Sequence, residues 1–264
     1  MIKIGCCLNM NAAGDPKIGA EHIPLFAELG FDYAELPLAQ VMDLPDDRFR
    51  TLLDTIITGI PVESCNNFFP ATIRLTGVDS NPDAAVEYAK AAFDKAAAMG
   101  VKVIVFGSSG AKNIPPGFPY ESAWVQLQRL LYKLDKTIKP YGITIVMEPL
   151  NKKESNLITI AAEGLSLVEE LKLDNVKLLI DYYHMRMENE DPDIIIKAGK
   201  NLRHTHIARK EGRIFPKPGD GENYGEFFTR LKTIGYDHRV SIEANSKDLK
   251  TDAADSLKYL RTFL

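Results

Sequence analysis

Short segments rich in β-branched residues alternate with longer amphipathic segments along the whole chain, and this alternation restricts the fold more than any other feature of the sequence. Eight segments have the composition of buried strands. They are residues 2–7 (IKIGCC), 33–37 (YAELP), 62–66 (VESCN), 101–107 (VKVIVFG), 143–149 (ITIVMEP), 176–184 (VKLLIDYYH), 202–208 (LRHTHIA) and 239–244 (RVSIEA). In the intervening segments apolar residues recur every three to four positions, which is the spacing of a helix with one buried face. These segments are residues 18–30, 46–57, 83–100, 120–142, 159–173, 193–199, 224–237 and 249–264.

Strands that alternate with helices predict a parallel sheet with right-handed crossovers. Eight such units in a chain of 264 residues fit a closed (β/α)8 barrel better than an open doubly wound sheet. Gly30, Gly100 and Gly142 stand at the ends of predicted helices, where glycine commonly turns the chain toward the next strand. No linker or change of composition marks a boundary between two domains. The fold class we expect is α/β, as a single barrel.

Composition and charge narrow the classes of function. Apolar residues make up 45% and charged residues 26% of the chain, and the net charge of -4 offers no basic excess for binding nucleic acid. No run approaches the roughly 20 apolar residues that cross a bilayer, so we expect no membrane association and a cytoplasmic protein. Cys6, Cys7 and Cys65 form no CxxC pair and are expected to be free thiols. The glycine-containing segment GSSGAKNIPPG lacks the spacing of a nucleotide-binding loop, so we expect no nucleotide cofactor.

Four consecutive predicted strands end in side chains that can bind a metal. Glu148, Asp181 and Glu243 end the fifth, sixth and eighth strands, and His206 lies in the seventh. In a parallel barrel the carboxyl ends of all strands meet at one rim, which is where active sites of this fold lie. Four such groups together would be costly to bury unless a cation or a proton compensated their charge.

A divalent metal is the economical compensation. Three carboxylates and one imidazole suit Mn²⁺, Mg²⁺, Co²⁺ or Zn²⁺ and leave coordination positions for substrate oxygens. Taken singly, each of these side chains has a structural explanation as a helix cap, a salt-bridged rim residue or a core histidine. Their position at corresponding strand ends favours the metal site over those explanations.

Several neighbouring side chains are weaker candidates. His184 follows the sixth strand and can point toward a bound substrate or bond to a loop carbonyl. His204 and His206 face the same side of a strand, and His206 is nearer the rim and is the better ligand. Glu35 ends the second strand as either a pocket wall or a salt-bridge partner. Cys65, at the end of the third strand, can line the pocket or fill a small space in the core.

Four segments carry a resemblance to a known family: MEPLNKKESNLITIAAEGLSLV, LLIDYYHMRMENED, RHTHIARKEGRIFPKPGDG and IGYDHRVSIEAN. They resemble the sugar isomerase/epimerase branch of the xylose-isomerase-like TIM barrels, and most of all the D-tagatose/D-psicose 3-epimerases and related ketose 3-epimerases. The likeness is dense from about residue 140 to 246 and elsewhere rests on LGFDYAEL and the strand-helix rhythm. It implies one TIM-barrel domain over residues 1–264.

The resemblance also implies roles for residues. It makes Glu148, Asp181, His206 and Glu243 the ligands of a divalent metal, with Mn²⁺ as the first choice. It gives Glu148 and Glu243 a second role as the acid/base pair.

For the substrate, the resemblance implies that Glu154, His184 and Arg213 hold the hydroxyl groups and the carbonyl. The sequence departs from the family where IARKEGR replaces the usual Gly-Glu-x-Asn-Arg, which leaves Arg209 as a rival of Arg213. It departs again where IEAN replaces the family's final MEP. The first-strand loop CCLNMNAAGDP lacks the family's aromatic pocket residues.

The reaction implied is proton removal beside the carbonyl of a small-molecule sugar and return of a proton to the opposite face, with a carboxylate on each face. Aldose-ketose isomerisation would use the same groups.

The main alternative is a lyase or dehydratase acting on a keto-sugar or a 3-keto glycoside, with a partner subunit completing the site. An abasic-site endonuclease would need more histidines than the five present and a basic face. A non-catalytic sugar-binding barrel is the remaining alternative.

Barrels of this type often form homo-oligomers, so a dimer or tetramer is also considered. The apolar segment of residues 114–124 (IPPGFPYESAW) would serve as a subunit contact or as a pocket lid.

Overall fold

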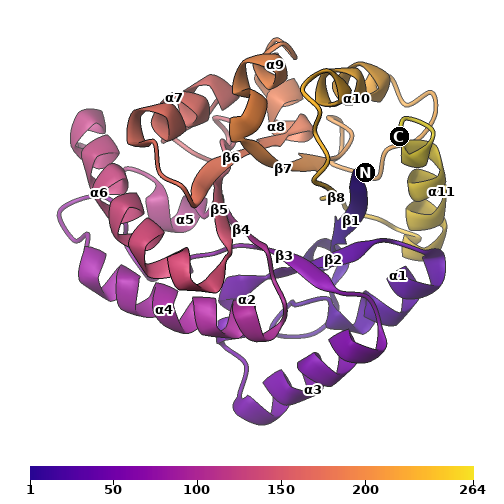
Figure 1. Ribbon diagram of the computed structural model, residues 1–264, viewed down its shortest axis with the longest axis horizontal. Coiled ribbons are helices and arrows are strands. Elements are labelled where there is room, and N and C mark those ends of the chain that lie inside the picture. Colours follow the sequence, from indigo (N-terminus) through magenta and orange to yellow (C-terminus); the bar gives the residue numbers. More distant parts are fainter.

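The computed structural model describes residues 1–264, and the chain forms a closed barrel of eight parallel strands in the order β1 to β8. The helices surround the strands as an outer ring (Figure 1). The predicted (β/α)8 barrel is therefore confirmed. The strands are β1 (Lys3–Cys7), β2 (Tyr33–Pro37), β3 (Val62–Asn66), β4 (Val103–Phe106), β5 (Thr144–Met147), β6 (Val176–Asp181), β7 (Leu202–Ile207) and β8 (Arg239–Ile242).

Each of the eight predicted helical segments contains a helix. The helices are α1 (Ile23–Leu29), α2 (Leu38–Met42), α3 (Asp46–Thr58), α4 (Pro82–Ala98), α5 (Ser109–Lys112), α6 (Tyr120–Ile138), α7 (Ala161–Leu171), α8 (Tyr182–Met187), α9 (Ile194–Ala198), α10 (Tyr224–Thr233) and α11 (Leu249–Arg261). The sequence did not predict α2, α5 or α8, which are helices of four to six residues at or just after the carboxyl ends of strands.

The main core lies between the barrel and its helices and contains 69 buried residues. Helix α6 shows how the pattern produces it, because Leu127, Leu130, Leu131 and Leu134 recur on one face and are all buried. One face of each strand meets the helices, and the other face fills the barrel, where buried polar side chains such as Glu35, His204 and Ser241 lie beside apolar ones. The barrel interior has a separate small apolar cluster made by Val103, Val105, Val146 and Leu179.

The sixth strand ends at Asp181, as the sequence predicted. The chain turns directly from β6 into α8 at this residue. The Asp181 Oδ1 atom accepts a hydrogen bond of 2.8 Å from the backbone N–H of Tyr183 and so caps this helix. His184 therefore lies on a short helix at the mouth of the barrel.

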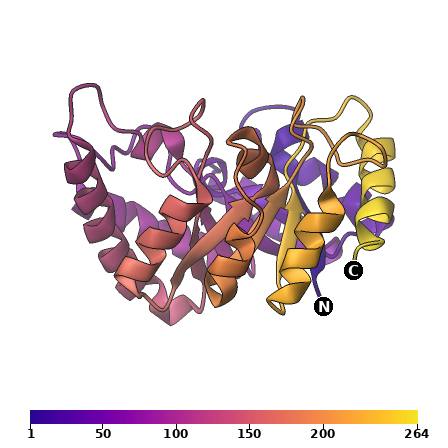
Figure 2. The same ribbon diagram turned by 90° about the horizontal axis from the view of Figure 1, so that it is seen from above.

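The two ends of the barrel differ. The chain termini lie toward one end, and the longer loops extend beyond the strands at the other (Figure 2). These loops follow the carboxyl ends of the strands, so they surround the rim that the sequence indicated. No helix has both the length and the apolar character needed to cross a bilayer.

Candidate active site

The structure brings together the four predicted ligand side chains at the carboxyl-terminal mouth of the barrel. Glu148 follows β5, Asp181 ends β6, His206 lies in β7 and Glu243 follows β8. One ligand atom from each lies within 4.8 Å of the others, and all four residues are buried. The Nδ1 atom of His206 is 3.1 Å from Glu148 Oε1 and 3.2 Å from Glu243 Oε2. We call these four residues the ligand cluster.

Burial and like charge perturb the acids of the ligand cluster. Burial raises the pKa of Asp181 to about 7, with the carboxylates of Glu243 and Glu148 adding to the effect. Burial also raises the pKa of Glu148. Burial opposes ionisation of Glu243 too, but the nearby Arg213 and His206 outweigh it and hold the pKa of that carboxyl well below its ordinary value. The ligand cluster therefore holds more acid groups than its own cations readily neutralise.

The donor set fits a divalent metal. The Asp181 Oδ2 atom is buried without a hydrogen-bond partner, and the Asp181 carboxylate has an oxygen within 4.8 Å of the ligand atoms of the other three residues. Such an unpartnered oxygen is costly to bury unless a ligand completes its coordination. Three carboxylates and an imidazole suit Mn²⁺, Mg²⁺ or Zn²⁺.

A second group of possible ligands, Cys7, Glu35 and His206, lies deeper in the barrel and shares His206 with the ligand cluster. Neither Cys7 nor Glu35 lines the cavity at the barrel mouth, so the ligand cluster is the better site for a metal that also contacts a substrate.

Arg213 reaches across the ligand cluster from the loop after β7. Its Nη2 atom donates to Glu243 Oε2 and lies 3.6 Å from Asp181 Oδ2, and its Nη1 atom lies 3.5 Å from Glu154 Oε2. The guanidinium also covers the Tyr183 ring at 4.5 Å from the ring centre. These contacts place Arg213 and Glu154 beside the ligand cluster.

His184 is held by Asn151, a residue that the sequence analysis did not single out. The Nδ1 atom of His184 accepts from the Asn151 backbone N–H at 3.2 Å and lies 2.8 Å from Asn151 Nδ2. Burial, aided by the charge of Arg213, lowers the pKa of His184 to about 3, so the ring is neutral. With Nδ1 as acceptor, Nε2 carries the proton; this atom makes no hydrogen bond within the protein and lies 3.6 Å from Asp181 Oδ2. His184 can therefore donate one hydrogen bond to a ligand.

The ligand cluster opens into a cavity at the barrel mouth, and two other predicted candidates do not line it. Arg209 forms an ion pair of 3.6 Å with Glu211, and it does not line that cavity. Cys65 is fully buried in β3 and serves as a packing residue.

Two neighbours of Glu148, Lys112 and Gly107, were not predicted from the sequence. Lys112 is fully buried, and its Nζ atom donates to Ser155 Oγ at 3.2 Å. Burial lowers the pKa of Lys112 to about 8, although Glu148 and Glu154 oppose this shift. A Cβ atom at Gly107 would lie 2.2 Å from Glu148 Oε2, so only glycine leaves room for that carboxylate. Both residues lie in the segment 107–113 (GSSGAKN). The only prediction made for this segment was that its glycines lack the spacing of a phosphate-binding loop.

The ligand cluster opens into a cavity of about 430 Å³. Glu148, Leu150, Glu154, Arg213 and Glu243 line one side of it. The segments after β1 to β4 form the other side, with six polar side chains, five apolar ones and two glycines. Their lining residues are Asn9, Met10, Ala39, Gln40, Asp43, Asn67, Phe69, Pro70, Ala71, Gly107, Ser108, Ser109 and Gly110.

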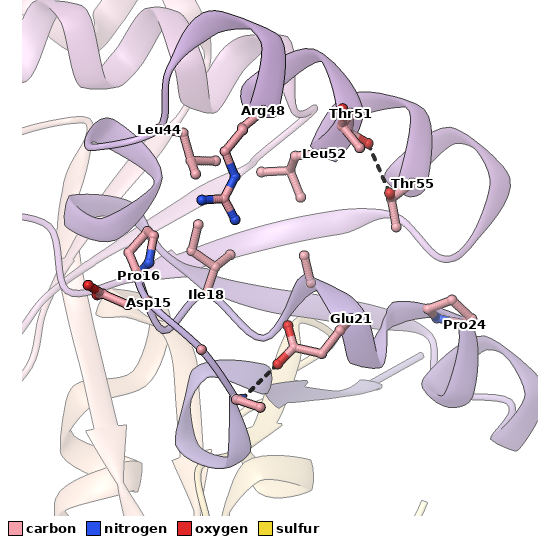
Figure 3. A pocket seen from close by; sticks show the side chains of 13 residues that line it. Asp15, Pro16, Ile18, Glu21, Pro24, Leu44, Arg48, Thr51, Leu52 and Thr55 are labelled. Carbon is pink, nitrogen blue, oxygen red and sulfur yellow. Dashed lines mark hydrogen bonds between the residues drawn. The ribbon is translucent and has the colours of Figure 1, made fainter.

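Another cavity, of about 500 Å³, lies outside the barrel between α3 and the loop after β1 (Figure 3). Arg48 extends into it from α3, and Asp15 and Glu21 line the opposite side. No member of the ligand cluster lines this cavity. The groups that can perform chemistry therefore lie at the barrel mouth.

A parallel eight-stranded barrel with acids and a histidine at its carboxyl-terminal mouth defines a TIM barrel with the arrangement of an enzyme. The model of the xylose isomerase-like TIM barrel family matches residues 23–263, and the chain belongs to that family.

Several curated relatives with sequence similarity are ketose 3-epimerases, which confirms the resemblance seen in the motifs. An L-ribulose 3-epimerase of Mesorhizobium japonicum is 32% identical over 133 residues, which cover 50% of this chain and 44% of that protein. A D-psicose 3-epimerase of Agrobacterium fabrum is 26% identical over 250 residues, which cover 89% of this chain and 82% of that protein. The match to the Mesorhizobium protein thus spans less than half of its length.

A solved structure shows the same fold. The crystal structure of a D-psicose 3-epimerase with D-tagatose from Clostridium cellulolyticum H10 has a TM-score of 0.87 and 22% sequence identity to this chain. The match covers 100% of this chain and 99% of the other.

Proposed function

We propose that the protein is a metal-dependent sugar epimerase, acting as a ketose 3-epimerase. The observation that carries the proposal is the placement of two buried carboxylates, Glu148 and Glu243, at 3.1 Å and 3.2 Å from the same atom, Nδ1 of His206. Relatives similar in sequence to the chain carry the names L-ribulose 3-epimerase and D-psicose 3-epimerase, which supports the proposal.

Glu148, Asp181, His206 and Glu243 would hold the metal. A divalent cation bound there supplies a Lewis acid that stabilises negative charge developing on a carbonyl oxygen. Mn²⁺ is our first choice, and Mg²⁺, Co²⁺ and Zn²⁺ suit the same donors. The unpartnered Asp181 Oδ2 atom supports this ligand set.

Glu148 and Glu243 exchange protons with carbon. One carboxylate removes the proton from the carbon next to the carbonyl, and the bonding electrons move toward the carbonyl oxygen. The other carboxyl returns a proton to the opposite face, and the carbonyl re-forms. The first carboxylate gains one proton and the second carboxyl loses one. The total charge of the substrate and the two acids is therefore unchanged. The result is inversion at that carbon.

His184, Glu154 and Arg213 orient the sugar. The unpartnered Nε2–H of His184 donates to a substrate oxygen, and the Glu154 carboxylate accepts from a hydroxyl group. Burial disfavours the charge on Arg213, but Glu243, Asp181 and Glu154 outweigh it and raise the pKa, so the guanidinium remains charged and donates to the carbonyl side of the sugar. These contacts hold the reacting carbon between the two acids.

Deuterium exchange tests the reaction. Purified protein loaded with Mn²⁺ is incubated in D2O with ketoses, keto-acids and 3-keto sugars, and incorporation at carbon is followed by NMR. We expect deuterium at C3 of a ketose together with formation of its C3 epimer. Absence of exchange in every compound would exclude proton abstraction at carbon.

A second candidate function is favoured by the polar side chains on the side of the cavity opposite the ligand cluster. Asn9, Gln40, Asp43, Asn67 and Ser109 line the half contributed by the loops after β1 to β4. Polar groups there suit a sugar that extends beyond the metal, such as a 3-keto glycoside, for which a lyase or dehydratase would use the same base. Cleavage of a 3-keto glycoside without turnover of free ketoses would support this candidate.

Location and assembly follow as proposals from the same features. Three buried free thiols, Cys6, Cys7 and Cys65, are compatible with a reducing, cytoplasmic compartment. We propose a dimer or tetramer, with residues 114–124 as the first contact to test by light scattering.

A further inference from the structure

A network of buried polar side chains lies beneath the ligand cluster, inside the barrel. Its centre is Glu35 of β2, which is completely buried. Glu35 Oε1 is 3.0 Å from His206 Nε2, and Glu35 Oε2 is 2.8 Å from His204 Nε2. Ser241 Oγ donates to the same Oε2 atom at 2.6 Å. One carboxylate therefore serves both histidines of β7.

The two ring nitrogens of His206 face different partners. Nε2 faces Glu35, and Nδ1 faces Glu148 and Glu243 at 3.1 Å and 3.2 Å. A carboxylate can only accept a hydrogen bond, so Nε2 must carry a proton in this arrangement. When the ring is neutral, Nδ1 carries the lone pair. This lone pair points toward the carboxylate oxygens of Glu148 and Glu243, where a metal would bind.

Every polar partner of Glu35 in this environment can donate a hydrogen bond. Its Oε1 atom faces His206, and its Oε2 atom faces His204 and Ser241. An isolated buried charge is costly, and an apolar side chain would fill the same space without that cost. A fixed carboxylate in this position therefore needs a role beyond packing.

We propose that Glu35 is a positioning residue of the metal centre, which holds the Nε2 proton and the ring orientation of His206 so that Nδ1 is free to bind the metal. The proposal rests on the metal centre of the proposed function and adds a residue to it. Cys7 cannot replace Glu35, because its Sγ atom lies 3.9 Å from His206 Nε2 and is a weak acceptor.

Metal affinity tests the role directly. The protein is stripped with a chelator and titrated with Mn²⁺ by isothermal titration calorimetry. In Glu35→Gln only one side-chain oxygen can accept, so one imidazole loses its partner and the charge is removed. We expect the Kd for Mn²⁺ to rise about 10- to 100-fold, as for other residues that orient metal-binding histidines.

The matched control changes another ion-paired carboxylate of the barrel. Glu63 of β3 pairs with Lys3 at 2.6 Å and with Arg239. Neither partner belongs to the ligand cluster, so we expect Glu63→Gln to leave the Kd within about twofold of the wild-type value. A Glu63→Gln variant that weakened Mn²⁺ binding as much as Glu35→Gln would overturn a role specific to Glu35.

Nitrogen-15 NMR of the Zn²⁺-loaded protein supplies a readout that a packing role would not produce. We expect a protonated Nε2 and a metal-shifted Nδ1 for His206. A proton on Nδ1 in the wild-type protein, or a folded Glu35→Gln variant with unchanged Kd, would overturn the proposal. If Glu35→Gln does not fold, Glu35→Asp keeps the charge at a shorter reach, and an unchanged Kd in that variant overturns it equally. Wild-type protein that bound no divalent metal would instead refute the metal centre and the proposed function.

Discussion

Gly107 leaves the space that the Glu148 carboxylate occupies in the active site. A Cβ atom at this position would lie 2.2 Å from Glu148 Oε2, which is too close for both atoms to keep their places. We expect Gly107→Ala to displace the Glu148 carboxylate and to lower both Mn²⁺ affinity and turnover at least tenfold. Calorimetric titration and the deuterium-exchange assay measure the two effects.

The control for this change is Gly225→Ala in α10. There the nearest atom to a new Cβ is Phe263 Cε1 at 3.4 Å, an ordinary contact, and alanine favours a helix by about 1 kcal/mol over glycine. We expect this variant to bind Mn²⁺ and to turn over as the wild type does. Equal behaviour of both variants would contradict the steric argument at Gly107.

Glu243→Gln tests the paired acids. The amide keeps the shape of the side chain and its contact with Arg213, but it cannot take up or deliver a proton. We expect loss of deuterium exchange and turnover by about 100-fold or more, with an unchanged circular dichroism spectrum. Full activity in this variant would refute the role of Glu243 as an acid/base group.

At the scale of an element, the start of α7 depends on a side chain from the loop after α8. Glu190 Oε2 accepts from the backbone N–H of Ala161 at 2.8 Å. Burial raises the pKa of Glu190 to about 7, although the hydrogen bonds from Ala161 and Ala162 oppose the shift. Between pH 4.5 and 7 the unfolded chain therefore releases this proton while the folded chain keeps it, so stability falls as the pH rises through this window.

Glu190→Gln keeps an acceptor for Ala161 and removes the titration. We expect the variant to unfold at a higher urea concentration than the wild type at pH 8 and at nearly the same concentration at pH 5. Glu169→Gln, on the exposed face of α7, should change neither midpoint. Lower stability of Glu190→Gln at pH 8 would show that the negative charge stabilises the helix end.

At the scale of the whole molecule, the ligand cluster joins four strands of the barrel, so a bound metal should stabilise the entire fold. At a Mn²⁺ concentration 100 times the Kd, binding adds about 2.7 kcal/mol to the free energy of unfolding. For a barrel of this size that corresponds to a rise in Tm of roughly 5 to 10 °C over the chelator-treated protein, measured by calorimetry.

Asp181→Asn is the control for metal stabilisation. Asparagine keeps the oxygen that caps α8 by accepting from Tyr183, but it removes the charge of a ligand. We expect the Tm of this variant to respond weakly to Mn²⁺. A full metal-dependent rise would show that Asp181 is not a ligand.

The sequence alone determined the barrel and the elements that carry the ligand cluster. Eight strand and helix periods specify a parallel (β/α)8 topology, and parallel strands bring Glu148, Asp181, His206 and Glu243 to one rim whatever the loops do. The apolar periodicity of each strand and helix is visible in a short segment of sequence. The alternation of strands with helices then implies that successive strands run parallel.

Only the tertiary structure decided which remaining side chains meet the ligand cluster. Arg213 rather than Arg209 reaches Glu243, and Glu35, Lys112 and Gly107 lie against the site from strands and loops far away in the chain. Sequence patterns marked Glu35 only as a pocket wall or a salt-bridge partner, and no pattern marked Lys112 or Gly107 as a neighbour of the site. Their roles depend on distances between separate strands and on burial, and both exist only once the barrel has closed.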